Sequence, residues 1–111
     1  EVIYCRALAI VLRQYDLKVQ EEVSLPVWFR GRIIGTFKAD LVVADAVLVE
    51  VKAAPVLEGH AEAQLLNYLK AAGGGVGLVL NFGKSASFKR LVMGDNPLNS
   101  LPAMKQNPPD E

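Results

Sequence analysis

The spacing of apolar residues divides the chain into helical and extended segments. In residues 1–14 they recur every three or four positions and no Gly or Pro interrupts them, which predicts a helix. The recurring positions are Tyr4, Leu8, Val11, Leu12 and Tyr15. Because this segment is apolar nearly all round, we expect it to be covered on two sides, by a sheet and by a second element such as a helix preceding Glu1.

Three strands are predicted in the next part of the chain. Residues 17–29 alternate loosely, are rich in β-branched residues and contain Pro26, where we expect an irregularity. The turn Arg30-Gly31-Arg32 should join them to a second strand, residues 33–43, in a hairpin. A short turn at residues 44–46 leads to a third run, residues 47–52, whose neighbours are apolar on both faces. This pattern indicates a strand buried on both sides of the sheet.

The second half of the chain predicts one helix and two further strands. The helix should span residues 60–72 and end at three glycines. Residues 76–82 form a buried strand by pattern, and residues 87–93 an edge strand. The order α-β-β-β-α-β-(β) predicts one α/β domain over residues 1–93, with a mixed β-sheet and a helix on each side. Residues 94–111 contain four prolines among polar residues, which predicts a disordered or loosely attached tail.

Charged residues interrupt the apolar strands at Asp40, Glu50 and Lys52. Side chains alternate along a strand, so Glu50 and Lys52 share a face, and hairpin pairing can bring Asp40 beside Glu50. A carboxylate in an apolar strand is costly unless it is paired or binds a metal. One interpretation is a surface salt bridge between Glu50 and Lys52. The other is a site in which two carboxylates hold Mg²⁺ or Mn²⁺ and activate a water against a phosphodiester.

At these positions the chain resembles the PD-(D/E)XK phosphodiesterase superfamily, whose motif is an Asp followed, after a variable gap, by Glu-x-Lys on the next strand. It is also similar to one branch of small proteins, the GxxExxY family. Glu1 and Tyr4 resemble the ExxY of that name, and the likeness continues in the same order through residues 38–41, 60–69 and 77–82. The family's Gly and a preceding helix would lie upstream of Glu1.

The resemblance implies a restriction-endonuclease-like core and a hydrolase, a Mg²⁺- or Mn²⁺-dependent nuclease. Asp40 and Glu50 would bind the metal together with the backbone carbonyl of Val51. Lys52 would position or deprotonate the attacking water, and Gln64 would orient the lysine, the water or a phosphate. The expected accessory residues are Glu1, Lys38, His60 and Tyr68. Nucleic acid is the expected partner, DNA more than RNA, and a homodimer or a partner protein are further assemblies to test.

Simpler roles stand beside these assignments. Glu1 would also be stabilised by the positive end of a helix dipole without touching a metal. Lys38 would also neutralise Asp40. The polar stripe of helix 60–72 is typical of the solvent edge of a helix. Trp28 belongs more often to a core or an interface than to a base-stacking site.

Composition limits the remaining classes. With 111 residues, 51% of them hydrophobic, the chain should form one domain with a modest core. Twelve basic and twelve acidic residues cancel, so no overall charge favours a polyanion. Local basic patches could still form at Arg30 and Arg32, and late in the chain at Lys84, Lys89 and Arg90. Cys5 is the only cysteine, which excludes a disulfide framework and a cysteine-ligated iron–sulfur cluster. No apolar run is long enough to span a membrane, and a reducing cytoplasm is the expected compartment.

Two functions follow from the sequence. The first is hydrolysis of nucleic-acid phosphodiester bonds, which the chemistry of the charged residues favours. The second is a non-catalytic module that binds nucleic acid or protein, in which the same residues form an ion-pair network that holds the fold. The neutral net charge favours the second.

Overall fold

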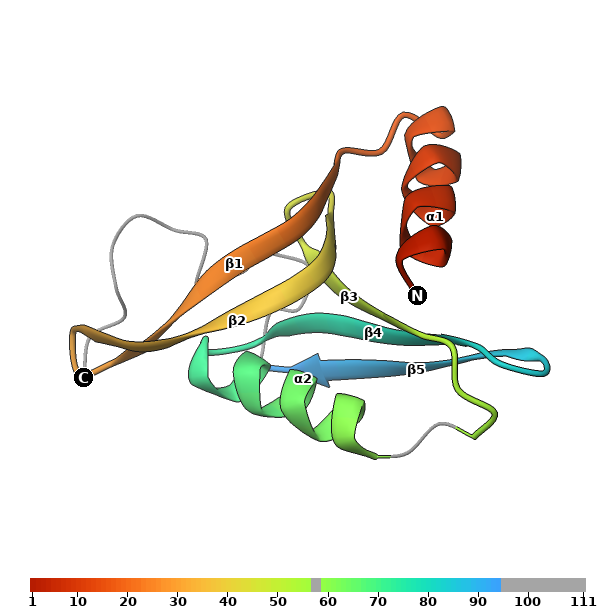
Figure 1. Ribbon diagram of the computed structural model, residues 1–111. Coiled ribbons are helices and arrows are strands. Elements are labelled where there is room, and N and C mark those ends of the chain that lie inside the picture. The colour runs from red at the N-terminus through yellow and green to blue at the C-terminus, as the bar shows by residue number, and fades with distance from the viewer. Residues whose placement is uncertain (57–58, 95–111) are drawn as a thin grey trace.

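The computed structural model describes residues 1–56 and 59–94, so the tail expected at residues 94–111 lies outside this part apart from Gly94. The elements in the described part follow one another as α1 (Val2–Gln14), β1 (Val19–Phe29), β2 (Arg32–Val43), β3 (Val47–Lys52), α2 (His60–Ala71), β4 (Gly75–Phe82) and β5 (Ala86–Met93). The predicted order of elements is therefore confirmed (Figure 1). Within the described residues no helix has the length and apolar character needed to cross a membrane.

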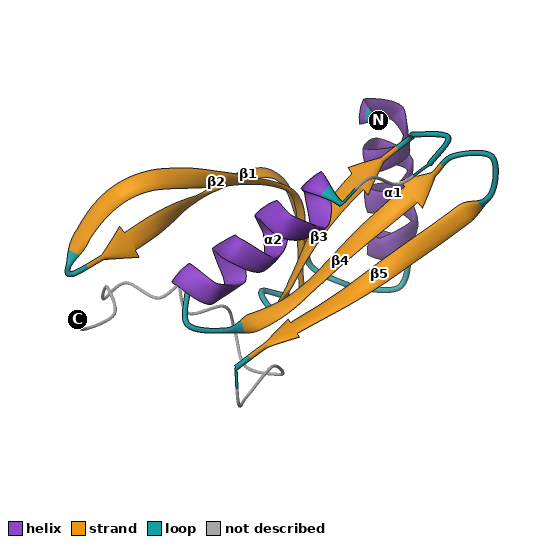
Figure 2. Ribbon diagram, turned by 90° about the horizontal axis from the view of Figure 1, so that it is seen from below, coloured by secondary structure: helices purple, strands orange, loops and turns teal. Residues whose placement is uncertain are grey.

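The strands form one mixed sheet in the order β1-β2-β3-β4-β5. Consecutive strands pair antiparallel except β3 and β4, which are parallel and are joined by α2 as a crossover. Helix α1 packs on one face of the sheet and α2 on the other (Figures 1 and 2). The expected helix on each side of a mixed sheet is confirmed.

Each helix covers its own core. The α2 side buries Val42, Leu48, Leu65, Leu69 and Val79, together with smaller residues. Helix α2 approaches β4 closely because Gly77 has no side chain: a Cβ there would lie 2.7 Å from Cδ2 of Leu65. The α1 side buries Ala9, Leu41, Val49 and Val51. As predicted, β3 is buried on both faces.

Only one face of α1 is covered. Ile3, Ile10 and Tyr15 point outward and are 80%, 57% and 75% exposed. We expected a second element over this face, but the described residues provide the sheet alone.

The β1–β2 hairpin extends beyond the rest of the sheet. Residues 32–39 of β2 have no partner on β3 and lie beside β1 alone, so this part of the sheet is two-stranded (Figure 2). The turn at its end has positive φ at Arg30 (50°) and Gly31 (74°), the geometry of a two-residue type I′ turn. We call residues 23–39 the arm. Its register shifts between Val27 and Trp28, just after Pro26, where the sequence predicted an irregularity.

A buried amide fixes the segment that follows β3. Asn81 on β4 accepts a hydrogen bond from the N–H of Ala54 (2.9 Å) and donates one to the carbonyl of Ala54 (3.0 Å). Asn81 is 4% exposed and is the register partner of Lys52. These two bonds therefore hold the chain immediately after Lys52 against the sheet.

Asn81→Ala should lower the free energy of unfolding by about 2 kcal/mol, because both hydrogen bonds to Ala54 are lost at once. Denaturant melts of the variant and the wild type measure this loss. The control is Asn67→Ala on the exposed side of α2, which should be neutral or slightly stabilising. Equal stability of Asn81→Ala and wild type would contradict the assigned role of the amide.

Candidate functional site

Asp40 lies at a break in the sheet. There β2 stops pairing with β3 and misses one pair in its ladder with β1. Toward β3 the ladder ends at the pair Leu41 and Val49, although β3 itself continues to Lys52 beside β4. Toward β1 the ladder passes over Asp40 and Glu22 without a pair. Backbone groups on both sides of the gap between β2 and β3 therefore need other partners.

The break also changes the face to which β2 side chains point. Ala39 packs in the α2 core and Leu41 in the α1 core, although residues two apart on a regular strand share a face. The alternation of side chains between the two faces of the sheet is therefore interrupted at Asp40. On β1, Glu22 adopts a left-handed backbone with φ of 51°, which costs a non-glycine residue on the order of 1 kcal/mol.

Two carboxylates bridge the gap between β2 and β3. The N–H of Val51 donates to Oδ2 of Asp40 (2.7 Å), and the N–H of Asp40 donates to Oε1 of Glu50 (3.3 Å). Side-chain oxygens thus take the place that carbonyl oxygens hold in a continuous ladder. The hairpin brings Asp40 beside Glu50, as the spacing of the two residues predicted.

The pair raises the pKa of Glu50 to about 7. Burial of Glu50 is the largest cause, followed by the negative charge of Asp40, and a side-chain hydrogen bond with Asp40 acts in the same direction. The backbone N–H of Asp40 and the charge of Lys52 oppose the shift. Near pH 7 Glu50 is therefore protonated in about half of the molecules.

Lys52 lies near this pair but does not form an ion pair with it. In the described ranges the ion pairs join Arg13 to Glu21 and Lys18 to Asp45, all on exposed side chains. Lys52 lines a cavity of about 470 Å³ together with His60 and Gln64 from α2. The ion-pair network expected from the second functional hypothesis is thus absent from the described residues. Backbone N–H groups hold the carboxylates instead.

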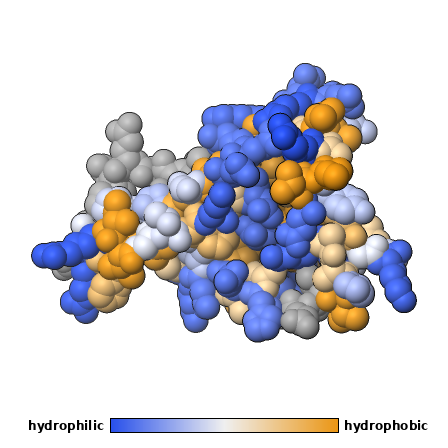
Figure 3. All heavy atoms as spheres, viewed as in Figure 1, coloured by the Kyte–Doolittle hydropathy of each residue, from blue (hydrophilic) through white to orange (hydrophobic). Residues whose placement is uncertain are grey.

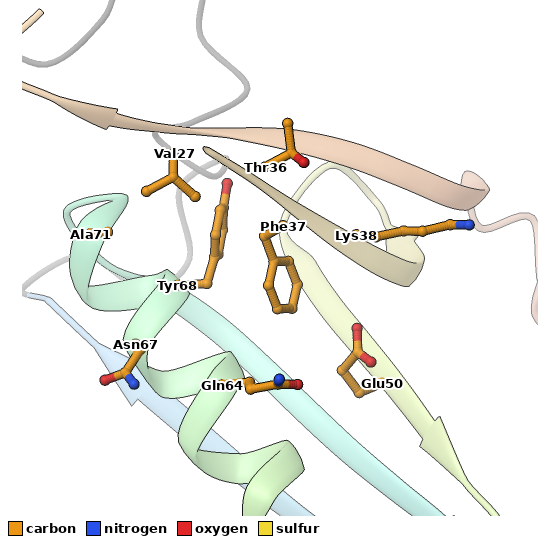
Figure 4. A pocket seen from close by; sticks show the side chains of 9 residues that line it. All are labelled: Val27, Thr36, Phe37, Lys38, Glu50, Gln64, Asn67, Tyr68 and Ala71. Carbon is orange, nitrogen blue, oxygen red and sulfur yellow. The ribbon is translucent and has the colours of Figure 1, made fainter. Parts of the chain in front are cut away.

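Helix α2 supplies the opposite wall of the site. A second cavity, of about 500 Å³, lies between α2 and the arm and reaches Glu50. Figure 4 shows Gln64 extending toward Glu50, while the amine of Lys38 points away from the helix. Gln64 lines both cavities, the one that reaches Glu50 and the one that Lys52 lines.

Tyr68 lines the same cavity but is fixed by packing. Its ring stacks on Phe37 with centroids 4.6 Å apart, and the residue is 3% exposed. Burial raises the pKa of its hydroxyl to about 12. Among the described residues this hydroxyl has no hydrogen-bond partner, and Figure 4 shows it directed toward Val27 and Thr36 rather than toward Glu50.

Helix α1 and strand β1 close the other side of Asp40, and two residues there, Cys5 on α1 and Glu22 on β1, had no predicted role in the site. Glu1, Cys5 and Glu22 line a cavity of about 340 Å³ with Asp40. Glu1 is at the N-cap of α1 and makes no capping hydrogen bond through its side chain. Burial and then the charge of Asp40 raise the pKa of the Cys5 thiol to about 11, so the thiol is protonated at neutral pH. In the sequence, Cys5 could be linked to the site only because it lies four residues after Glu1, on the same face of the helix.

The gap suits a hard divalent cation. Among the described residues no three His, Cys, Asp or Glu side chains are grouped as a metal site. A cation at the gap would therefore have at most the two carboxylates and backbone oxygens as protein ligands. The N–H and C=O of one strand residue point the same way, and the N–H of Val51 points at Asp40, so its carbonyl also faces the gap. Two neighbouring carboxylates repel each other, and a cation bound between them removes this repulsion.

In metal-free buffer the stability of the fold should fall as pH rises through the titration of Glu50. Its pKa is 4.5 in the ordinary state and about 7 in the fold, so the folded state holds the extra proton between these values. The free energy of unfolding should therefore drop between pH 4.5 and about 7, by on the order of 1 to 2 kcal/mol once partial exposure is allowed for.

Denaturant melts across this range, with a chelator present, measure the effect. Glu50→Gln should remove this part of the pH dependence, whereas Glu62→Gln on α2, which has no part in the shift of Glu50, should retain it. Parallel pH profiles for the wild type and Glu50→Gln would contradict the shifted titration.

Comparison with known proteins identifies the family of the chain. A family model described as the PD-(D/E)XK nuclease superfamily matches residues 1–91. No curated protein and no solved structure gave a significant match. The matched range contains α1, the β2–β3 gap and α2, and the five-stranded mixed sheet with its two helices is consistent with a restriction-endonuclease-like α/β fold. The chain belongs to the PD-(D/E)XK nuclease superfamily.

Proposed function

We propose that this chain hydrolyses phosphodiester bonds in nucleic acid, DNA in preference to RNA, with Mg²⁺ or Mn²⁺ as cofactor. The observation that supports the proposal most directly is the pair Asp40 and Glu50, which meets across a gap where backbone pairing stops. Such an arrangement leaves oxygen ligands in place of a ladder, close to a lysine and next to a cavity. We assign the chain to the GxxExxY branch of the superfamily, with residues 1–93 as the nuclease-like unit and the cytoplasm as its compartment.

Each residue of the site has a proposed task. Asp40, Glu50 and the carbonyl of Val51 would hold the cation, which when bound supplies the positive charge that lowers the pKa of a water and neutralises the phosphate. Lys52 orients or deprotonates the attacking water and stabilises the negative charge that develops on phosphorus-bound oxygens. Gln64 orients Lys52, the water or a phosphate oxygen from α2.

The accessory residues surround this centre on three sides. Glu1 shares a cavity with Asp40, Lys38 shares one with Glu50, and His60 shares one with Lys52. Tyr68 supports the wall that carries Gln64 through its stack on Phe37. We propose that these residues position substrate and ligands rather than take part in proton transfer.

Divalent metal should raise the melting temperature of the wild type but not of Asp40→Asn. A cation that binds only the folded state stabilises it by about 2.7 kcal/mol at about a hundred times its dissociation constant. The matched control is Asp45→Asn in the β2–β3 turn, which removes an exposed carboxylate and should keep the full response. Thermal melts with Mg²⁺ or Mn²⁺ against a chelator give the result. A response that survives in Asp40→Asn would mean that the metal binds elsewhere.

Lys52→Ala should abolish cleavage while the metal-dependent shift in melting temperature remains. We expect a loss of at least about 10²-fold in rate, because a group that acts on the water and the transition-state charge is removed. Stability should change by less than about 1 kcal/mol, since Lys52 forms no ion pair in the described residues.

The assay uses labelled single- and double-stranded DNA and RNA with Mn²⁺, and Lys70→Ala at the far end of α2 is the control. Cleavage retained by Lys52→Ala would overturn the role of this lysine. A wild type inert on all four substrates, together with a metal-free Lys52→Ala that is destabilised by on the order of 3 kcal/mol, would favour the binding module instead.

A further inference from the structure

Charge is unevenly distributed along the chain, although it sums to zero. The arm carries Arg30, Arg32 and Lys38 and contains no Asp or Glu, so the remainder of the chain has an acidic excess of three. Glu21, Glu22 and Asp40 stand immediately outside the ends of the arm. The arm is therefore positively charged, and acidic residues stand where it joins the rest of the domain.

The cations of the arm are not neutralised by neighbours. Neither ion pair of the described residues involves the arm, and no described side-chain hydrogen bond engages Arg30, Arg32 or Lys38. The guanidinium carbon of Arg30 lies 5.4 Å from the centroid of the Phe29 ring, a cation–π contact. This contact orients the guanidinium and leaves its N–H donors at the edge for an anion.

Exposed apolar side chains accompany these cations at the tip. Phe29, Ile33 and Ile34 are 56%, 56% and 65% exposed. Ile34 is passed over in the ladder, because Val27 pairs with Gly35 and Trp28 with Ile33. The end of the arm, at the left in Figure 3, accordingly shows hydrophobic and hydrophilic surface side by side. Proteins that bend or open nucleic acid insert such apolar side chains beside cations that contact phosphate.

The arm begins at the candidate reaction site and leads away from it. Thr36, Phe37 and Lys38 line the cavity that reaches Glu50, and Lys38 is two residues from Asp40. Arg32 precedes Asp40 by eight residues, so the tip lies at most about 27 Å from the site along an extended strand. This reach corresponds to roughly eight nucleotides of one strand of a duplex.

The base of the arm is anchored, whereas its tip is exposed as far as the described residues extend. A two-stranded hairpin is marginal in water by itself. In the described part of the chain the base and middle of the arm pack on the α2 core, and the tip does not. Leu25, Val27 and Phe37 contact the α2 core, and the stack of Phe37 on Tyr68 belongs to this anchor. The anchor sets the direction of the arm relative to Glu50.

From these observations we infer that the arm is the surface that binds the nucleic-acid strand away from the scissile bond, with Arg30 and Arg32 contacting its phosphates. This inference rests on the proposed function. It adds a binding surface for nucleic acid on the arm, distinct from the carboxylates at which we propose that cleavage takes place.

A second copy of the chain fits the tip less well. A contact between the tips of two copies would place Arg30 and Arg32 against the same cations without acidic partners. A polyanion satisfies both arginines and still covers the apolar side chains. Self-association and binding to an anionic vesicle are therefore tested as the competing outcomes.

The experiment compares two double variants in metal-free buffer, where binding is separated from cleavage. The tip variant is Arg30→Gln with Arg32→Gln, and the matched control, with the same loss of charge, is Lys89→Gln with Arg90→Gln on the edge strand β5. Affinity for labelled duplexes of about 20 and about 6 base pairs is measured between about 50 and 200 mM salt. The tip variant should bind the long duplex at least about 10-fold more weakly and with a log–log salt slope smaller by nearly 2, whereas the short duplex should distinguish it little from wild type.

The outcomes separate this inference from the proposed function. Arg30→Lys with Arg32→Lys should recover most of the affinity, which would exclude misfolding of the turn. Equal losses in the tip variant and the β5 control, or no loss in the tip variant, would overturn the inference even if the chain cleaves DNA. A tip variant that loses only self-association or vesicle binding would overturn it as well. A chain that binds through the tip but cleaves nothing would retain the inference and reject hydrolysis.

Discussion

Two hydrogen bonds from backbone N–H groups to carboxylates hold the β2–β3 gap, and the site depends on them. With regular pairing, Asp40 and Glu50 would lie opposite each other, with their backbone groups bonded across the ladder and their side chains free on one face. Here the side chains bond across the gap themselves. The carboxylates gain fixed positions, and the backbone of Val51 is turned toward them. The cost is two like charges in a partly buried place, which the raised pKa of Glu50 records.

Net charge proved a poor guide to the surface. The cancellation of twelve basic and twelve acidic residues argued against a polyanionic partner. In the structure the two signs occupy different places, with cations along the arm and carboxylates at its base. The electrostatic potential near a binding site depends on this local arrangement because charges more than about 10 Å apart are largely screened at physiological salt.

The sequence predicted the elements of the fold well because each has a clear period and clear ends. The pairing of Asp40 with Glu50 followed from alternation and a short turn. Whether Lys52 reaches a carboxylate depends on side-chain conformation, which no pattern specifies, and the expected ion pair is absent from the described residues. The roles of Cys5 and Glu22 were missed because they depend on how α1 and β1 pack around Asp40. The projection of the arm was missed because β2 looks uniform in sequence while its partner changes at Asp40.

The same break accounts for both the site and the arm. A β2 that stayed paired with β3 would have both edges bonded, and the hairpin could not diverge from the sheet. Because β2 leaves β3 at Asp40, residues 32–39 continue with β1 alone, and the space that opens between the arm and α2 becomes the cavity that reaches Glu50. The left-handed Glu22 lies at the same level on β1, so both strands of the hairpin are irregular where the carboxylates stand. A single change in strand pairing thus places the Asp40–Glu50 pair, the cavity and the arm one after another along β2.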